Sequence, residues 1–180
     1  SDGTIWFTDP SYGYLQGFRP KPMVGDFVYR YDPHTERISV VADNFNKPNG
    51  IAFSPDESVL YINDSGANQE PGNYYVDKPH HILAYDLLEG RHLINQRLFA
   101  VTHPGFPDGM KCDAQGNVYV AAFSGVQVFN PLGDLIGEIM VPNTVNFTFG
   151  GPGNNILFIT DDTAIWAATL EATGAIRPTS

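Results

Sequence analysis

Short apolar stretches alternate with polar turns along almost the whole chain. The segment 27–31 alternates side-chain character with a period of two, which is typical of a half-buried β-strand. Asp-Gly at positions 2–3 and similar polar pairs predict tight turns between such segments. No segment longer than a turn has the helical period. The predicted strands are 4–9, 27–31, 37–42, two within 47–64, 81–87, 93–99, two within 106–121, 125–129, 134–141, 145–149, 155–161 and 163–170.

Two of these regions repeat one pattern. Pro48-Asn49-Gly50 and Pro107-Asp108-Gly109 each precede an apolar strand, a turn with aspartate and a second apolar strand. A weaker third copy begins at Asn146. The second strands of the repeats contain Trp6, Tyr61, Tyr119 and Phe158, at spacings of 55, 58 and 39 positions. Such a repeat predicts an all-β protein of the β-propeller type, with about four blades over residues 1–170.

The ends and the long loops complete this organisation. The chain opens on a turn in mid-blade and without methionine, so we expect the beginning of the propeller to be missing. Residues 171–180 are predicted to be a polar, frayed tail. The loops 10–25 and 65–79 are expected to form a lid over one end of the propeller channel. An open ring would expose apolar surface and strand edges, which favours self-association.

Composition narrows the classes of function. The 18 glycines, 14 prolines, 9 tyrosines and 12 phenylalanines suit many short strands and turns. A formal charge of −10 disfavours nucleic-acid binding. Cys112 is the single cysteine, which excludes an intrachain disulfide. No apolar run approaches the ~20 residues of a membrane helix, so a soluble protein is expected, with its compartment left open between cytoplasm and secretion.

The repeated motifs carry the strongest candidate chemistry. Asn49 and Asp108 hold the same place in two repeats, so a propeller directs both toward one axis. An amide oxygen and a carboxylate without nearby His or Cys suit a hard cation such as Ca²⁺ or Mg²⁺, whereas Zn²⁺ more often recruits His or Cys. The alternative is that both are ordinary turn residues before glycine.

The motifs also resemble a known family. Residues 2–10 (Asp-Gly-Thr-Ile-Trp-Phe-Thr-Asp-Pro), 48–56 and 107–117 are similar in sequence, order and spacing to the SMP-30/gluconolactonase/LRE family, and most of all to its microbial and fungal gluconolactonases. The resemblance implies a six-bladed propeller, one divalent metal ion in the channel (Ca²⁺ first, with Zn²⁺ or Mg²⁺ as alternatives) and hydrolysis of a small-molecule lactone.

The resemblance assigns two ligands here. Asn49 and Asp108 match the family's asparagine and aspartate, whereas the glutamate and a further asparagine would precede Ser1. The implied mechanism is polarisation of the lactone carbonyl by the metal, with Asp108 as the base toward water. Two other readings stay open: a related calcium-propeller esterase or phosphotriesterase, and a non-catalytic truncated propeller that acts as a binding module.

Four further residues are candidates for substrate binding. Asn146 holds the motif position of the third copy, and His103 shortly precedes Pro107-Asp108. Tyr12 and Tyr74 lie in the two long loops, where their rings could stack on a sugar. The alternatives are an ordinary loop histidine and tyrosines that pin the loops to the body. Asp9, Asp64 and Asp161 end equivalent strands, which favours a structural role in capping the next turn.

Overall fold

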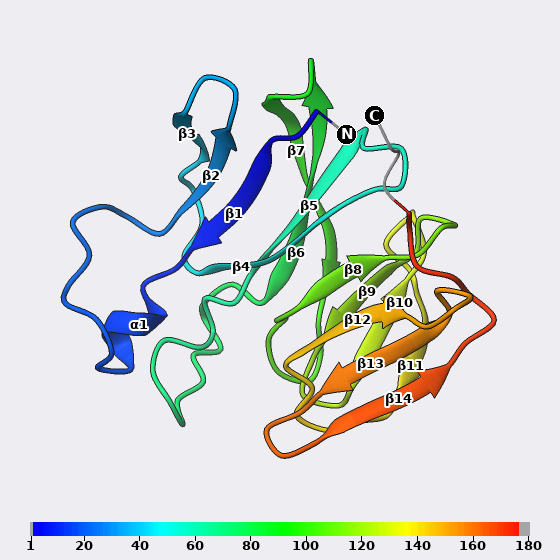
Figure 1. Cartoon of the computed structure of the whole chain (residues 1–180). Helices are drawn as coiled ribbons and strands as arrows, with labels where there is room; N and C mark the ends of the chain where they lie inside the picture. Colours follow the sequence, from blue (N-terminus) through cyan, green and yellow to red (C-terminus); the bar gives the residue numbers. More distant parts are fainter. Residues whose placement is uncertain (1, 177–180) are drawn as a thin grey trace.

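The chain folds into four antiparallel sheets that follow one another in sequence order (Figure 1). The computed structural model describes residues 2–176. The first sheet contains β1 (Ile5–Asp9), β2 (Phe27–Asp32) and β3 (Arg37–Ala42). The second contains β4 (Pro48–Phe53), β5 (Val59–Asp64), β6 (His81–Leu88) and β7 (His92–Val101). The third contains β8 (Met110–Cys112), β9 (Val118–Ala121), β10 (Val126–Phe129) and β11 (Leu135–Ile139). The fourth contains β12 (Asn146–Gly150), β13 (Ile156–Thr160) and β14 (Ile165–Thr169).

The sheets are propeller blades, which confirms the predicted fold. Strand β4 contacts β8 of the next sheet, β8 contacts β12, and β1 contacts β4. The first strands of the second, third and fourth blades, β4, β8 and β12, therefore lie side by side, as radial packing around one axis requires. Strand β5 is the second strand of the second blade, and β1 is its counterpart in the first blade. The described part of the first blade therefore begins at the position of a second strand. The expected loop 10–25 contains the short helix α1 (Tyr12–Leu15).

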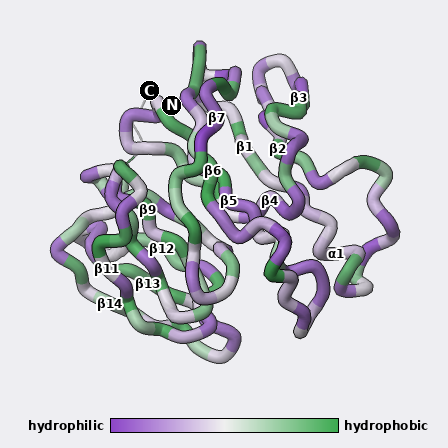
Figure 2. The backbone as a smooth tube through the Cα atoms, turned by 180° about the vertical axis from the view of Figure 1, so that it is seen from behind, coloured by the Kyte–Doolittle hydropathy of each residue, from purple (hydrophilic) through white to green (hydrophobic). Residues whose placement is uncertain are grey.

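The period-two pattern of the central strands fills two cores at once. Leu60 and Ile62 of β5 pack with Val28 of the first blade, whereas Tyr61 between them packs with Met110 of the third. Strand β5 is therefore buried on both faces, which explains why its sequence reads as a continuous apolar run. A similar core, which includes Tyr119, Phe147, Leu157 and Ile159, joins the third and fourth blades. Short hydrophobic stretches alternate with hydrophilic ones along the blades (Figure 2).

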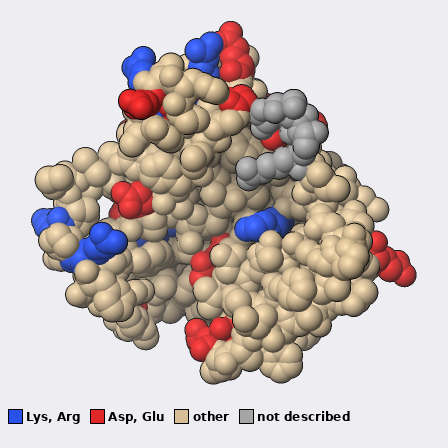
Figure 3. Space-filling view, in the orientation of Figure 1, with Lys and Arg blue, Asp and Glu red and all other residues tan. Residues whose placement is uncertain are grey.

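The first and last blades are apolar on exposed faces. Ile5 is 55% exposed on β1, and Ile165 is 75% exposed on β14. Phe7 and Phe158 are also exposed. The apolar surface that an open ring predicts is thus present. Charged side chains are scattered over the face seen in Figure 3. No helix among residues 2–176 is long and apolar enough to cross a membrane.

The last described residues differ from the predicted frayed tail. The Ala175 N–H donates to the Cys112 carbonyl at 3.1 Å, and the Ala114 N–H donates to the Thr173 carbonyl at 2.8 Å. Gly174 is buried and forms a β-bridge with Asp113. The tail prediction is therefore wrong for residues 173–175, because their backbone groups find partners beside β8 that sequence pattern does not reveal. Residues 177–180 lie outside the described part.

Candidate functional site

The two repeated motifs meet at the inner edges of the second and third blades. Asn49 belongs to β4, and Asp108 lies just before β8. A Cβ atom on Gly50 would lie 2.2 Å from the Asp108 carbonyl oxygen, and one on Gly109 would lie 2.2 Å from Asn146 Oδ1. Glycine thus fits both positions, because atoms of the next motif occupy the space of a side chain: a backbone carbonyl beside Gly50, and the side chain and Cα of Asn146 beside Gly109. The third motif copy at Asn146 is part of the same inner row.

Hydrogen bonds through Ser65 link the motifs of the two candidate ligands. The Asn49 side-chain amide donates to the Ser65 hydroxyl at 3.1 Å and lies close enough to the Asp108 carboxylate to lower its pKa. The Ser65 hydroxyl in turn donates to the Pro107 carbonyl. The structure therefore brings Asn49 and Asp108 together, as their place in the repeat predicts. The roles of both residues as metal ligands stay predictions, and so does the catalytic role of Asp108.

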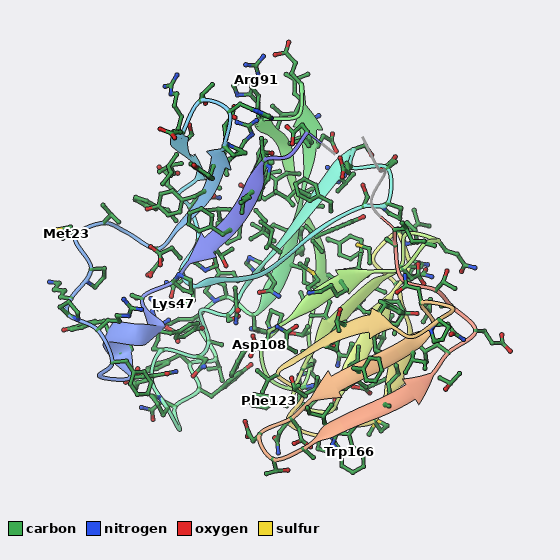
Figure 4. All side chains as sticks on the ribbon, viewed as in Figure 1. Met23, Lys47, Arg91, Asp108, Phe123 and Trp166 are labelled. Carbon is green, nitrogen blue, oxygen red and sulfur yellow. The ribbon has the colours of Figure 1, made fainter. Side chains whose placement is uncertain are left out.

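The Asp108 carboxyl is electrostatically unusual. Burial raises its pKa to about 6, and the hydrogen bond from Asn49 offsets part of this rise. A carboxylate of this kind is ionised for the most part at neutral pH but can still accept a proton. In Figure 4 the labelled Asp108 lies at the centre of the molecule, between Lys47 and Phe123. This combination of burial and a shifted pKa is a common property of functional groups.

Two further buried polar residues support the site, and the sequence analysis did not single them out. Asn63, which is fully buried, accepts a hydrogen bond from the Gly50 N–H at 2.9 Å and donates one to the Asp108 carbonyl at 2.6 Å. Ser65 is fully buried as well. The available signal was an Asn and a Ser flanking Asp64 at the end of an apolar strand, where buried polar groups need partners.

A cavity opens beside Asp108. Its volume is about 210 Å³, and its wall includes the Phe106 and Phe123 rings, which pack edge to face with centroids 4.9 Å apart. Polar side chains face the same space. The complete lining is Asn68, Phe106, Asp108, Ala122, Phe123, Asn143, Thr144, Val145 and Asp162. The lining therefore combines aromatic rings with amide and carboxyl groups, a mixture that suits a ring with apolar and hydroxylated faces.

The two loop tyrosines have different surroundings. The Tyr12 hydroxyl donates to the Ser65 carbonyl at 3.2 Å, and its pKa is raised by burial first and by the nearby Asp108 charge second. Tyr12 thus lies next to the ligand pair. Tyr74 lies farther out, donates to the Gly105 carbonyl at 3.2 Å and packs on Phe123. Neither side chain lines the cavity, and their contacts with substrate stay predictions.

The other two candidates are also placed outside the cavity wall. His103 is exposed, and its carbonyl accepts a hydrogen bond from Gln127 at 2.6 Å. The Asn146 side chain accepts from the Phe147 N–H at 2.8 Å and lies beside Gly109. Asn146 is therefore close to the motif of Asp108, whereas His103 contributes its backbone carbonyl to a hydrogen bond with Gln127. A substrate role for each stays a prediction.

A buried ion pair fastens the first long loop to the site. Lys47, in the motif of Asn49, forms a salt bridge to Asp26 at 2.7 Å, and both side chains are mostly buried. The Lys47 N–H donates to Asp64 at 2.8 Å, and so does Gly66 N–H at 2.9 Å. The turn-capping role predicted for Asp64 is therefore confirmed. Helix α1 and the loop 65–79 lie at the same end of the molecule (Figures 1 and 2).

The two candidate ligands offer the type of donor atom that a hard divalent cation prefers, but they are too few to hold the ion alone. Asn49 and Asp108 offer side-chain oxygens at a half-buried point, the donor type that Ca²⁺ and Mg²⁺ prefer. Within residues 2–176, no three His, Cys, Asp or Glu side chains gather in a way that could hold a metal ion. These two residues are thus fewer than the ligands such an ion needs, and the remaining oxygens must have another source.

The family follows from comparison with known proteins. Residues 1–163 match the model of a protein family that is described as "SMP-30/Gluconolactonase/LRE-like region". The chain belongs to this family. It is 34% identical over 167 residues to lactonohydrolase oryH of Aspergillus oryzae, a match that covers 85% of this chain and 36% of oryH. The chain therefore spans little more than a third of the length of this relative.

Solved structures agree with the fold. The gluconolactonase XC5397 of Xanthomonas campestris is 32% identical, with a TM-score of 0.79 over 96% of this chain and 54% of that one. A regucalcin of Agrobacterium tumefaciens, described as a calcium-binding protein, is 20% identical, with a TM-score of 0.68 over 84% of this chain and 55% of that one. Both solved structures thus share this blade arrangement.

Proposed function

We propose that the protein hydrolyses small-molecule lactones at the cavity beside Asp108. The observation that supports the proposal is the proximity of Asn49 to Asp108, whose half-buried carboxylate lines this cavity. The lactonohydrolase and gluconolactonase relatives support the reaction class. A sugar lactone fits the mixture of aromatic and polar walls.

Asp108 has the chemistry for both proton transfers. Its carboxylate accepts a proton from the water whose oxygen attacks the lactone carbonyl carbon. When the ring carbon–oxygen bond breaks, the leaving oxygen takes that proton, and the product is an open hydroxy acid. The Phe106 and Phe123 rings exclude bulk water from one side and hold the apolar face of the ring. Asn68 and Asn143 offer hydrogen bonds to its hydroxyl groups.

Asn49 and Asp108 would hold one divalent ion. Such an ion supplies electrophilic stabilisation of the developing oxyanion and acidifies water. Ca²⁺ is the first choice, because both donors are oxygens and because the regucalcin of similar fold is a calcium-binding protein. Mg²⁺ and Zn²⁺ are the alternatives for the test below.

The test compares Asp108→Asn with wild type in the full-length protein. We expect Asp108→Asn to reduce lactone turnover at least about a hundredfold while the thermal unfolding profile stays close to wild type. Asp43→Asn, an exposed aspartate outside the site, is the matched control and should retain full activity. Turnover should also fall after chelation and return with Ca²⁺.

Other outcomes distinguish other functions. Near-normal turnover in Asp108→Asn would remove this residue from the mechanism. Hydrolysis of open-chain esters or phosphotriesters in preference to lactones would favour the related esterase activity. Saturable binding of lactones without turnover by the full-length wild type would make the protein a binding module.

A further inference from the structure

A repeated hydrogen bond reaches each candidate ligand from the blade before it. Thr8, in β1 of the first blade, donates its hydroxyl to the carbonyl of Asn49 in the second blade at 2.8 Å. Asn63, in β5 of the second blade, donates its side-chain amide to the carbonyl of Asp108 in the third blade at 2.6 Å. In both cases the acceptor is the backbone oxygen of the motif residue itself.

The two donors occupy equivalent positions in the repeat. Thr8 follows Trp6 by two residues, and Asn63 follows Tyr61 by two. Each is the second-to-last residue of its strand, and the strand then ends with Asp9 or Asp64. Two different side chains at one structural position thus make the same type of bond to the next blade, so the bond belongs to the repeat and not to one local sequence.

The third interface lacks this bond. The equivalent position in β9 is Ala121, whose side chain has no hydrogen-bond donor. The Asn146 carbonyl instead accepts a hydrogen bond at 2.9 Å from Thr160, which lies in the same blade as Asn146. The bond between blades is therefore present for both candidate ligands and is replaced at the motif copy that the family resemblance does not assign as a ligand.

We propose that Thr8 and Asn63 are positioning residues that set the distance between Asn49 and Asp108. The inference rests on the proposed metal-dependent function. Each peptide carbonyl adjoins the Cα that carries the ligand side chain, so a fixed carbonyl fixes the position and direction from which that side chain projects. Because blades pack through non-directional apolar contacts, directional bonds at the inner edge define the spacing of the ligands.

Thr8 is the better position for mutation. Asn63 is fully buried and also accepts a hydrogen bond from the Gly50 N–H. Its replacement would therefore leave the Gly50 N–H without a partner. Thr8→Val removes only the hydroxyl at nearly constant volume, and Thr8→Ser keeps it. Thr160→Val is the matched control, because it removes the same type of bond from Asn146 within one blade.

The experiment is a calorimetric titration of the full-length, metal-free protein with Ca²⁺. Loss of one ordinary hydrogen bond predicts about fivefold weaker binding for Thr8→Val. Thr8→Ser and Thr160→Val should bind as wild type does. Equal thermal unfolding of the metal-free variants would show that the change is not a general loss of fold. Wild-type affinity in Thr8→Val, or the same loss in Thr160→Val, would overturn the proposal.

A second readout does not depend on metal. In the metal-free protein, Thr8→Val should shift the NMR signals of the Gly50 backbone amide and the Asn49 side-chain amide, whereas Thr160→Val should leave both unchanged. If the wild type binds no divalent ion, the proposed function fails, but these signals still decide whether Thr8 positions Asn49. Unchanged signals in Thr8→Val would refute the positioning role in either case.

Discussion

Replacement of Gly50 by alanine tests the closest backbone approach in the site. The new methyl carbon would lie 2.2 Å from the Asp108 carbonyl oxygen and 2.6 Å from Asn63 Nδ2. An ordinary contact needs more than 3 Å, so the two motif backbones must separate by about 1 Å. The first obstacle is backbone and cannot rotate away. The separation also lengthens the bond between Asn63 and Asp108.

The expected cost follows from these contacts. Overpacking of a well-packed interior costs about 1–3 kcal/mol, and loss of a buried hydrogen bond adds about 1 kcal/mol. We therefore expect Gly50→Ala to lower the free energy of unfolding by about 3 kcal/mol. The measurement is equilibrium urea unfolding of the full-length protein, with the slope of the transition compared between variants.

Gly137→Ala is the matched control. Gly137 lies in β11, and a Cβ atom there would have no neighbour within 4 Å. Alanine at this position should be neutral or stabilising by up to about 1 kcal/mol, because it restricts the unfolded chain. If Gly50→Ala were as stable as Gly137→Ala, the close approach of the two motifs would be refuted as the reason for glycine at position 50.

Three other predictions concern groups around the site and in the blades. Lys47→Met should lower the free energy of unfolding by about 3 kcal/mol and speed proteolysis within residues 10–25, because Asp26 loses its buried partner; unchanged cleavage would contradict this tethering. Burial raises the pKa of the Cys112 thiol to about 12, so a thiol reagent at pH 8 should modify it only after unfolding; rapid labelling of the native protein would contradict the burial. The indole of Trp166 and the backbone N–H groups that follow Asp161 lower the pKa of this carboxyl to about 2. Wild type should be more stable than Asp161→Asn at neutral pH, and the difference in melting temperature should vanish as pH falls from about 4 to about 2; a constant difference would contradict the assignment.

In Figure 4 Asp108 lies centrally, whereas Trp166 and Met23 lie at the periphery. The strands could be predicted because their signal is local. Period-two alternation and turn dipeptides act on neighbouring residues, and the structure has a strand in each predicted segment. The capping role of Asp161 is equally local, since its carboxylate accepts from Thr163 and Ala164.

The repeat extended this prediction to the site. Asn49 and Asp108 are equivalent in two blades, and equivalent positions in a radial array face the same axis. This geometric rule brought two residues together across 59 positions (108 − 49) without any knowledge of contacts. The resemblance of the motifs to the SMP-30/gluconolactonase/LRE family then suggested their chemistry.

The tertiary structure alone decided the environment of these groups. The raised pKa of Asp108 depends on burial by several blades, and the bonds from Thr8 and Asn63 cross from one blade to the next. Gly174 pairs beside β8, although the local sequence predicted a frayed end. The sequence by itself determined the strands, the repeat and the ligand candidates, because these depend on short-range periodicity. Desolvation and hydrogen bonds between blades depend on which distant residues become neighbours, and only the packed fold determines that.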